Sequence, residues 1–378
     1  MHIEEGRVRQ DEQGAERLVE GIEKRLQRKL KTEVRNAFLQ VPRHLFLEHY
    51  YRQQGNRLTW DRIATPAPEE IYADEVLVTK IDARGHPVSS SSQPSVMARQ
   101  LELLNLHAGL SVLEIGTGTG YNAALLGAMV GSTGQIISLD IDQELITTAI
   151  QHLDAAGVTN VLAVEGNGFQ GYSEYAPYNR LLATCAVRTL PRVWVEQLAP
   201  GGVLLVNLRL HLSSVFLLLK KAAPPILEGR LLDLNAAYME MHNFERLPKP
   251  LQVNWNIYDA QPHREVQLPA NLAELLTRPA YSVLLECLLP GVRKKYRVFP
   301  GEHEVHTYLI DISVPGAAIA VRGDHAMIIG SQEYLSARLL QSMEWYERFN
   351  VTIEDYTVSF DEAKAVLSLG ERRFSLEI

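Results

Sequence analysis

The sequence predicts an α/β protein built around a doubly wound, mostly parallel sheet, with an N-terminal helical segment and a C-terminal α+β domain. Between Pro94 and about residue 208, short apolar runs alternate with amphipathic segments at strand–helix spacing. The first of these strands runs into a glycine-rich turn, and beyond residue 210 the alternation gives way to mixed signals. We therefore expect three parts: a helical segment and loop at 1–90, the doubly wound domain at 91–210, and the α+β domain at 211–378.

The N-terminal part combines a clear helical pattern with a long polar stretch. Apolar residues recur every four positions from Leu18 to Leu30, which predicts an amphipathic helix. A second helix is expected to begin near Thr32 and to end before Pro42. Residues 51–92 are rich in turn formers, which predicts a long ordered loop with one short strand over 75–81. Long loops in compact domains tend to be functional.

The elements that follow are expected in regular order. Pro94 suits the first turn of a helix. Apolar runs then predict strands at 111–115, 135–140, 161–165, 180–184 and 203–208, and periodic segments predict helices at 121–130, 144–156 and 191–198. In the last domain we expect helices at 268–277 and 332–350 and strands at 307–314, 317–322, 352–360 and 374–378.

Composition excludes several classes of function. The chain has 378 residues and a net charge of −8, which disfavours a partner recognised through nucleic-acid phosphates. Its apolar runs fall far short of the roughly 20 residues of a membrane span, and its charged N-terminus is unlike a signal peptide. Two cysteines indicate a reducing compartment, so we expect a cytoplasmic protein without a membrane partner.

The turn after the first predicted parallel strand is Gly116-Thr117-Gly118-Thr119-Gly120. Such a turn lets the backbone approach a ligand and points helix N–H groups at it, as in sites for NAD, FAD and S-adenosylmethionine (SAM). Glu114 lies two residues before the first glycine, where a carboxylate would repel a pyrophosphate. It would instead orient the loop or bind the amino group of a methionine moiety.

Two further strand ends favour SAM among these ligands. Asp140 ends the next strand, where it would accept hydrogen bonds from both ribose hydroxyls. Gly166-Asn167-Gly168 closes the third strand, where an amide would read an adenine edge. Ligands bind at the carboxyl ends of parallel strands, so the three signals together predict one SAM site. The alternative is that these residues form no ligand site, the glycines serving only tight turns and the acid facing solvent.

Seven motifs occur in the order in which one enzyme family carries them. They are Val41 to Phe46, Ser92-Gln93-Pro94, Val112 to Tyr121, Ser138 to Ile141, Gly166 to Gly168, Ala176-Pro177-Tyr178 and Leu198 to Gly202. Over about residues 35–210 the chain thus resembles the protein-L-isoaspartate O-methyltransferases. The resemblance implies a Rossmann-like methyltransferase sheet and SAM as methyl donor, with S-adenosyl-L-homocysteine as product. It also implies a peptide or protein acceptor with an aspartyl or isoaspartyl carboxylate.

Departures from the family pattern suggest a particular branch. Repair enzymes usually carry an aspartate where this chain has Asn167, which keeps an acceptor oxygen and loses the charge. The serine run 89–92, residues 183–188 and the extension after 210 resemble enzymes of ribosomal peptide biosynthesis (lanthipeptide and ATP-grasp-ligated types). That resemblance implies methylation of an aspartate whose ester closes to an aspartimide. Isoaspartyl repair is the first alternative, and a catalytically weak peptide-binding module is the second.

The resemblance also implies roles for single residues. Ser92 matches a serine beside the acceptor and is the predicted catalytic residue, donating its hydroxyl to the acceptor carboxylate; the alternative is a helix cap. The predicted cofactor-binding residues are Glu114, Gly116, Thr117, Gly118, Gly120, Asp140, Ile141, Gly166, Asn167 and Gly168. The predicted substrate-binding residues are Ser90, Ser91, Gln93, Cys185 and Arg188.

The remaining features carry weaker expectations. No metal site is expected, because His303 and His306 are three residues apart rather than four and precede a strand. Cys185 lacks an evident base partner, so packing or substrate contact is favoured over a nucleophilic role. The basic cluster Arg293–Arg297 is either a solvated face or a patch for an acidic peptide. We expect the domain from 211 to contribute to peptide recognition, or else to cover the sheet edge or form a dimer interface.

Overall fold

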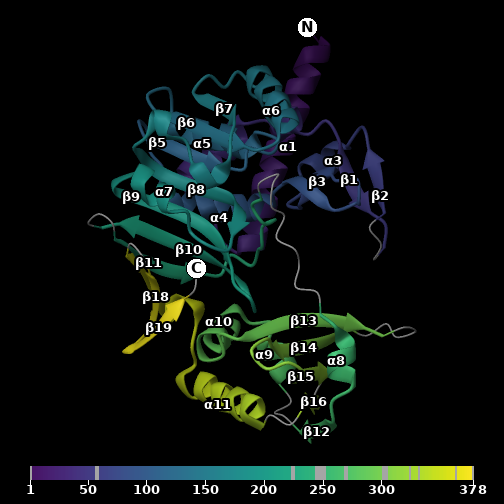
Figure 1. The fold of residues 1–378 in the computed structure, drawn as a ribbon. Helices are drawn as coiled ribbons and strands as arrows, with labels where there is room; N and C mark the ends of the chain where they lie inside the picture. Colours follow the sequence, from purple (N-terminus) through teal and green to yellow (C-terminus); the bar gives the residue numbers. More distant parts are fainter. Residues whose placement is uncertain are drawn as a thin grey trace.

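The computed structural model describes residues 2–55, 59–222, 226–242, 253–267, 271–299, 305–322, 325–330, 333–361 and 364–376. Its centre is a ten-stranded sheet (Figure 1). The strands in spatial order are β19 (Arg372–Leu376), β18 (Lys364–Leu369), β17 (Tyr356–Asp361), β11 (Leu227–Leu232), β10 (Ser214–Lys221), β9 (Leu198–Arg209), β8 (Tyr178–Val187), β5 (Ser111–Ile115), β6 (Gln135–Asp140) and β7 (Val161–Glu165). The last five of these run parallel to one another, which confirms the predicted mostly parallel sheet.

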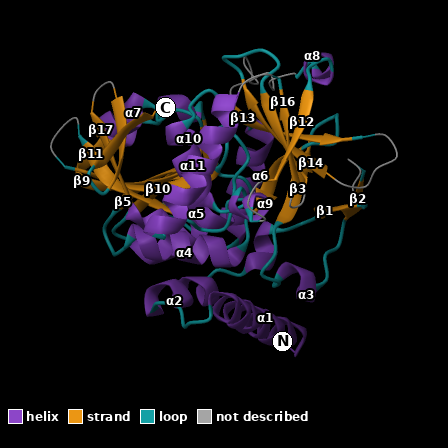
Figure 2. Ribbon diagram, turned by 90° about the horizontal axis from the view of Figure 1, so that it is seen from below, coloured by secondary structure: helices purple, strands orange, loops and turns teal. Residues whose placement is uncertain are grey.

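The parallel strands are apolar throughout because both of their faces are covered. In β5, Val112 packs into the core on one face and Leu113 into the core on the other. The first face carries α1 (His2–Leu26), α2 (Thr32–Gln40), α4 (Pro94–Leu104), α5 (Tyr121–Val130) and α6 (Gln143–Ala155). Figure 2 shows α1 and α2 as an outer layer beyond α4 and α5. The second face carries α7 (Arg192–Gln197), and the core on this side continues through α10 (Pro279–Leu288) to α9 (Leu272–Leu275) and α11 (Glu333–Phe349), which pack on a second sheet.

The strand predicted over 75–81 is present as β3 (Leu77–Ile81), but the long loop predicted around it is wrong, because 51–92 folds into a small antiparallel sheet. Its order is β2 (Trp60–Ile63), β1 (Tyr50–Gln53), β3 and β4 (Pro87–Ser91), with α3 (Pro68–Ile71) between β2 and β3. These strands are short, and many of their side chains are partly or fully exposed. The apolar alternation that marks a half-buried strand is therefore missing from the sequence.

The predicted boundary at residue 210 is also wrong as a limit of the central sheet. β10 and β11 continue the sheet beyond β9, and β17 to β19 return to it from the end of the chain, pairing through β11. The C-terminal domain is therefore an insertion between β11 and β17. This pairing joins residues more than a hundred positions apart, which local sequence patterns do not reveal.

The inserted domain is built on a five-stranded antiparallel sheet. Its order is β12 (His263–Gln267), β16 (His325–Ile329), β15 (Ala318–Arg322), β14 (Val305–Asp311) and β13 (Val292–Val298), with α8 (Trp255–Asp259) nearby. α10 fixes the domain to the central sheet, because Glu286 accepts hydrogen bonds from the backbone N–H groups of His211 (3.0 Å) and Leu212 (2.8 Å). The helix predicted over 268–277 is a single turn, α9, and residues 268–270 lie outside the described residues.

Candidate active site

The three strand ends singled out in the sequence meet at the carboxyl edge of the parallel strands. Oδ2 of Asp140, at the end of β6, accepts the backbone N–H of Gly118 in the loop after β5 at 3.0 Å. The N–H of Gly166, after β7, donates to the carbonyl oxygen of Asp140 at 2.8 Å. The structure thus brings the predicted cofactor-binding residues of all three strands together at one edge.

Two positions of the glycine loop favour glycine, and at one of them, Gly116, the packing also leaves no room for a side chain. Gly116 has a φ of 103°, and a Cβ there would lie 2.4 Å from Oγ1 of Thr184 on β8. Gly118 has a φ of 53°, and its Cβ would lie 3.5 Å from Oγ of Ser89 on β4. Both φ values lie in the left-handed region that favours glycine. The loop is therefore held between β8 and the N-terminal sheet.

Glu114 is fully buried, and both of its oxygens have partners within the protein. Ser138 Oγ donates to Oε2 at 2.5 Å and Asn122 Nδ2 donates to Oε1 at 2.6 Å. Ser138 Oγ also lies 2.7 Å from Oγ1 of Thr117 in the loop. Burial raises the pKa of Glu114 to about 7. These contacts favour loop orientation, the first of the two predicted roles.

Replacing Glu114 with glutamine is expected to change how stability depends on pH. The folded-state pKa of about 7 exceeds the ordinary value of 4.5, so the wild type loses stability as pH rises through that window. The glutamine variant has no carboxyl group at this position and does not lose stability in this way. The difference between its free energy of unfolding and that of the wild type should therefore rise by up to about 3 kcal/mol between pH 4.5 and 8. Urea unfolding at several pH values measures it. The exposed Glu165 is the matched control position, and an equal difference at every pH would contradict the assignment.

Asp140 presents a carboxylate held by backbone donors. Besides Gly118, the N–H groups of Asp142 (3.1 Å) and Ile141 donate to it. Burial nevertheless raises the pKa of Asp140 above its ordinary value. A carboxylate fixed at a strand end beside side-chain-free glycines fits a ligand with adjacent hydroxyls, as the ribose of SAM has. The residues present therefore fit the cofactor.

The loop after β7 is ordered by its own polar contacts. Oδ1 of Asn167 accepts the N–H of Phe169 at 3.0 Å and so caps the short 3₁₀ helix η2 (Gly168–Gln170). The carbonyl oxygen of Gly168 accepts Nε1–H of the buried Trp194 at 2.8 Å. Asn167 thus needs no aspartate to hold this turn. Its Nδ2 group makes neither of these bonds, and the predicted adenine contact of Asn167 stays a prediction.

Ser92 lies between β4 and α4 and does not cap the helix. The N-terminal Ser95 N–H of α4 donates instead to Oδ1 of Asp74 at 2.7 Å. Asp74 lies in the segment before β3 and also forms an ion pair with Arg25 at 2.6 Å. The structure therefore leaves Ser92 without the capping role that was its alternative.

The other predicted substrate-binding residues differ in whether their side chains already form hydrogen bonds within the protein. Oγ of the buried Ser91 accepts from Nη2 of Arg43 at 3.1 Å, and the Gln93 amide donates to the carbonyl oxygen of Asp74 at 3.2 Å. Both side chains thus hold the local structure. Ser90 is half-buried in β4, with its carbonyl oxygen beside Gly118.

Cys185 and Arg188 follow the same edge of the sheet on β8 and just after it. Burial raises the pKa of the Cys185 thiol to about 12, so it stays protonated at neutral pH and a nucleophilic role is disfavoured. Arg188 forms a two-point ion pair with Glu240, with Nε–Oε1 at 2.6 Å and Nη2–Oε2 at 2.9 Å.

Sequence reasoning missed the segment that crosses this edge, residues 238–241. Ala186 N–H donates to the carbonyl oxygen of Met239 at 2.8 Å, and Met241 N–H donates to that of Ala186 at 2.7 Å. The side chain of Met241 reaches Gly168, where an added Cβ would lie 2.8 Å from its sulfur. The segment has no motif or periodicity. Only its place between β11 and the inserted domain brings it here.

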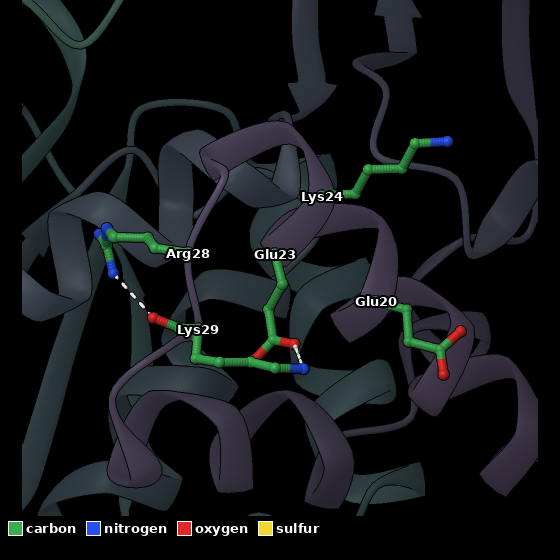
Figure 3. Close-up of a pocket in the computed structure, with 5 residues that line it drawn as sticks. All are labelled: Glu20, Glu23, Lys24, Arg28 and Lys29. Atoms are coloured by element: carbon green, nitrogen blue, oxygen red, sulfur yellow. Dashed lines mark hydrogen bonds and ion pairs between the residues drawn. The ribbon is translucent and has the colours of Figure 1, made fainter.

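Features elsewhere in the described chain do not form a competing site. The hollow on α1 is lined by Glu20, Glu23, Lys24, Arg28 and Lys29 (Figure 3). Lys29 and Glu23 are paired at 2.7 Å there, as on an ordinary charged surface. Within the described ranges no group of three potential metal ligands occurs, and no helix has the length and apolarity to span a membrane. His303 lies outside the described residues.

The chain matches a family model and several curated relatives. The model "Protein-L-isoaspartate(D-aspartate) O-methyltransferase (PCMT)" covers residues 15–233. The protein-L-isoaspartate O-methyltransferase of Thermotoga maritima is 37% identical over 191 residues, which are 50% of this chain and 55% of that protein. The chain thus spans little more than half of this relative's length. The Methanosarcina mazei enzyme of the same name is 35% identical over 54% of this chain and 75% of its own.

One solved structure agrees with these sequence matches. This structure, titled protein-L-isoaspartate O-methyltransferase, has a TM-score of 0.57 and 26% identity, and the match covers 94% of this chain and 99% of that one. Another, from Plasmodium falciparum, is described as a complex with S-adenosyl-L-homocysteine; it shares 18% identity over 60% of this chain, with a TM-score of 0.46. The first match includes the inserted domain as well as the central sheet.

Proposed function

The chain belongs to the protein-L-isoaspartate O-methyltransferase family, whose members are SAM-dependent carboxyl methyltransferases, and from this we propose that it methylates the free carboxylate of isoaspartyl residues in peptides or proteins of the cytoplasm. The single observation that carries the proposal is the match of one solved enzyme of that name to 94% of this chain. The carboxyl-edge site, with its glycine loop, Asp140 and Ser92, supports it.

A more specific substrate has less support than isoaspartyl residues. This substrate is an aspartate of a modified ribosomal peptide, whose methyl ester would close to an aspartimide. The extension after residue 210 is one of the three sequence features that favour it. That extension does not separate the two readings, because the solved relative is matched over 94% of this chain. Residues 89–92 and 183–188 still differ from the pattern of the repair enzymes. The comparison of three substrates below therefore includes a cyclised aspartyl peptide.

The proposed chemistry asks the chain for positioning more than for proton transfer. SAM supplies an electrophilic methyl group, and a carboxylate is already ionised at pH 7, so no strong base is needed. The hydroxyl of Ser92 would orient the acceptor carboxylate for in-line attack, which is where most of the rate would come from. The segment 238–241 would limit access of water to the reacting atoms.

A comparison of three substrates tests the proposed function. The full chain is incubated with SAM and an isoaspartyl peptide, the aspartyl peptide of the same sequence, or a cyclised aspartyl peptide, and methyl ester formation is followed by mass spectrometry. We expect the isoaspartyl peptide to be methylated fastest. Methylation of the cyclised peptide alone would replace the proposal with the aspartimide reading. Peptide binding without methylation of any substrate would indicate the binding module.

We propose that the inserted domain contributes a basic surface to substrate recognition. It consists of Arg293 and Lys295 on β13, the edge strand that faces the central-sheet domain in Figure 1. Arg188 lies beside the site, but its charge is already paired with Glu240. Burial, followed by the positive charges of Arg188 and Arg293, lowers the pKa of Lys295. Cations held together in this way attract acidic side chains that flank the acceptor residue.

Replacing Lys295 with glutamate is expected to raise KM about fivefold or more for an isoaspartyl peptide with acidic flanking residues. KM for a neutral peptide should stay within twofold, and the difference should shrink at 0.5 M salt. The matched control is Lys220→Glu, because Lys220 is an exposed lysine of β10 that lies away from the site. Equal changes for both peptides would contradict the proposal. Truncation at 210 is unsuitable, because it removes five strands of the central sheet.

A further inference from the structure

Arg43 is a fully buried cation next to the end of β4. Its guanidinium donates to three backbone carbonyl oxygens, those of Ile71 (2.9 Å), Ala73 (2.7 Å) and Glu75 (3.3 Å). It also donates to Oγ of Ser91, the last residue of β4, at 3.1 Å. All four acceptors are neutral. One planar group, whose donors have a fixed geometry, thus ties the segment 71–75 to β4.

The segment 71–75 also contacts the residues on the other side of Ser92. Oδ1 of Asp74 accepts the backbone N–H of Ser95 at 2.7 Å, and the carbonyl oxygen of Asp74 accepts the side-chain amide of Gln93 at 3.2 Å. Positions 91, 93 and 95 are therefore bonded either to the guanidinium or to the segment that it holds. Ser92 lies between these fixed points, so its backbone has little freedom to shift.

The same strand, β4, packs against the cofactor side of the site. A Cβ on Gly118 of the glycine loop would lie 3.5 Å from Oγ of Ser89 and 3.7 Å from the carbonyl oxygen of Ser90. Oγ1 of Thr79 on β3 donates to Oγ of Ser89 at 3.2 Å and holds that side chain in place. A shift of the end of β4 would therefore change where Ser92 lies relative to the loop that is expected to hold SAM.

Stability alone is a weak reason for a cation at this place. A buried guanidinium loses its hydration, and hydrogen bonds to neutral oxygens return only part of that free energy. An apolar side chain of similar volume would avoid the loss. What Arg43 supplies, and an apolar residue would not, is directed hydrogen bonding to both segments that flank Ser92.

We propose that Arg43 is a positioning residue for methyl transfer, which fixes Ser92 relative to the methyl donor through Ser91 and the segment 71–75. The inference rests on the proposed function, because it gives Arg43 this task only if Ser92 meets an acceptor carboxylate. Ser91, which the sequence predicts to bind substrate, then acts through its bond to the guanidinium and not by touching the peptide.

A double-mutant cycle with two variants of different severity tests the inference. Arg43→Lys keeps the charge and loses the planar fork, whereas Ser91→Ala removes one acceptor. We expect kcat to fall about tenfold and about fivefold, respectively, with KM for the peptide and the affinity for S-adenosyl-L-homocysteine within twofold of wild type. In a Ser92→Ala background the same changes should lower kcat less than twofold, because the group that they displace is gone. If Arg43→Lys does not fold, Ser91→Ala alone decides.

Two matched controls separate positioning from a general loss of stability. Arg180, near the amino end of β8 and away from the site, also donates to three backbone carbonyl oxygens. Ser282 is another buried serine that donates to a backbone carbonyl oxygen, in α10. Arg180→Lys and Ser282→Ala should lower the thermal midpoint and leave kcat unchanged. An unchanged kcat in the folded Arg43 and Ser91 variants, or equal losses with and without Ser92, would overturn the inference.

The cycle is measured with whichever of the isoaspartyl, aspartyl and cyclised peptides the wild type methylates fastest. If that substrate is not the isoaspartyl peptide, the proposed function is overturned, while the coupling of Arg43 to Ser92 is still obtained from the same kcat values. If the wild type methylates none of the three, both the proposed function and the inference are overturned.

Discussion

Asp140→Ala is expected to weaken SAM binding by roughly 2–3 kcal/mol or more, which corresponds to about 30-fold or more in the dissociation constant. The carboxylate is fixed at the end of β6 by the N–H groups of Gly118 and Asp142, so its oxygens face a defined place beside the glycine loop. Removing it leaves two ribose hydroxyls without a charged acceptor. Isothermal titration calorimetry with SAM measures the loss.

The matched control for this variant is Asp142→Ala. It removes the same charge two residues away, where the side chain caps α6 and pairs with Lys80 at 2.6 Å. We expect this control to lower the thermal midpoint and to leave SAM affinity within about threefold. Unchanged SAM affinity in Asp140→Ala would contradict the assignment of the cofactor site.

Ser92→Ala is expected to lower kcat about 50-fold while SAM affinity stays nearly intact. The serine lies on the acceptor side of the site, and the N-terminus of α4 is capped by Asp74 rather than by Ser92. Loss of its hydroxyl therefore removes a donor to the acceptor and not a helix cap. Steady-state methylation of an isoaspartyl peptide gives kcat, and calorimetry gives the affinity.

Ser92→Thr keeps the hydroxyl and should recover a large part of the activity lost in the alanine variant. The thermal midpoints of both variants should lie close to that of the wild type, because no cap is removed. If kcat of Ser92→Ala stays within twofold of wild type, the acceptor role of Ser92 is wrong.

The meeting of three strand ends at one edge could be predicted because its signals are local. A buried strand, a glycine turn and an acid at the next strand end are each readable within a few residues, and a parallel sheet must bring successive strand ends to one edge. The structure agrees, with Asp140 bonded to Gly118. For Glu114 the sequence allows two roles, and its buried contacts with Ser138 and Asn122 favour loop orientation.

The remainder depends on contacts between distant parts of the chain. Tyr238 and Gln100 are 138 positions apart, and no pattern near either residue announces their hydrogen bond. The return of β17–β19 to the central sheet is set by pairing with β11, which lies before the inserted domain. β1 and β2 are not predictable for another reason: half of their side chains are exposed, so they lack the apolar alternation from which strands are recognised.

The most direct test of the central claim is the ratio of kcat/KM for an isoaspartyl peptide to that for the aspartyl peptide of the same sequence, measured with SAM and the full chain. The account predicts a ratio well above one, of at least about 100, with the methyl group located by mass spectrometry on the isoaspartyl residue. A ratio at or below one, with a cyclised aspartyl peptide methylated faster than either, would contradict it.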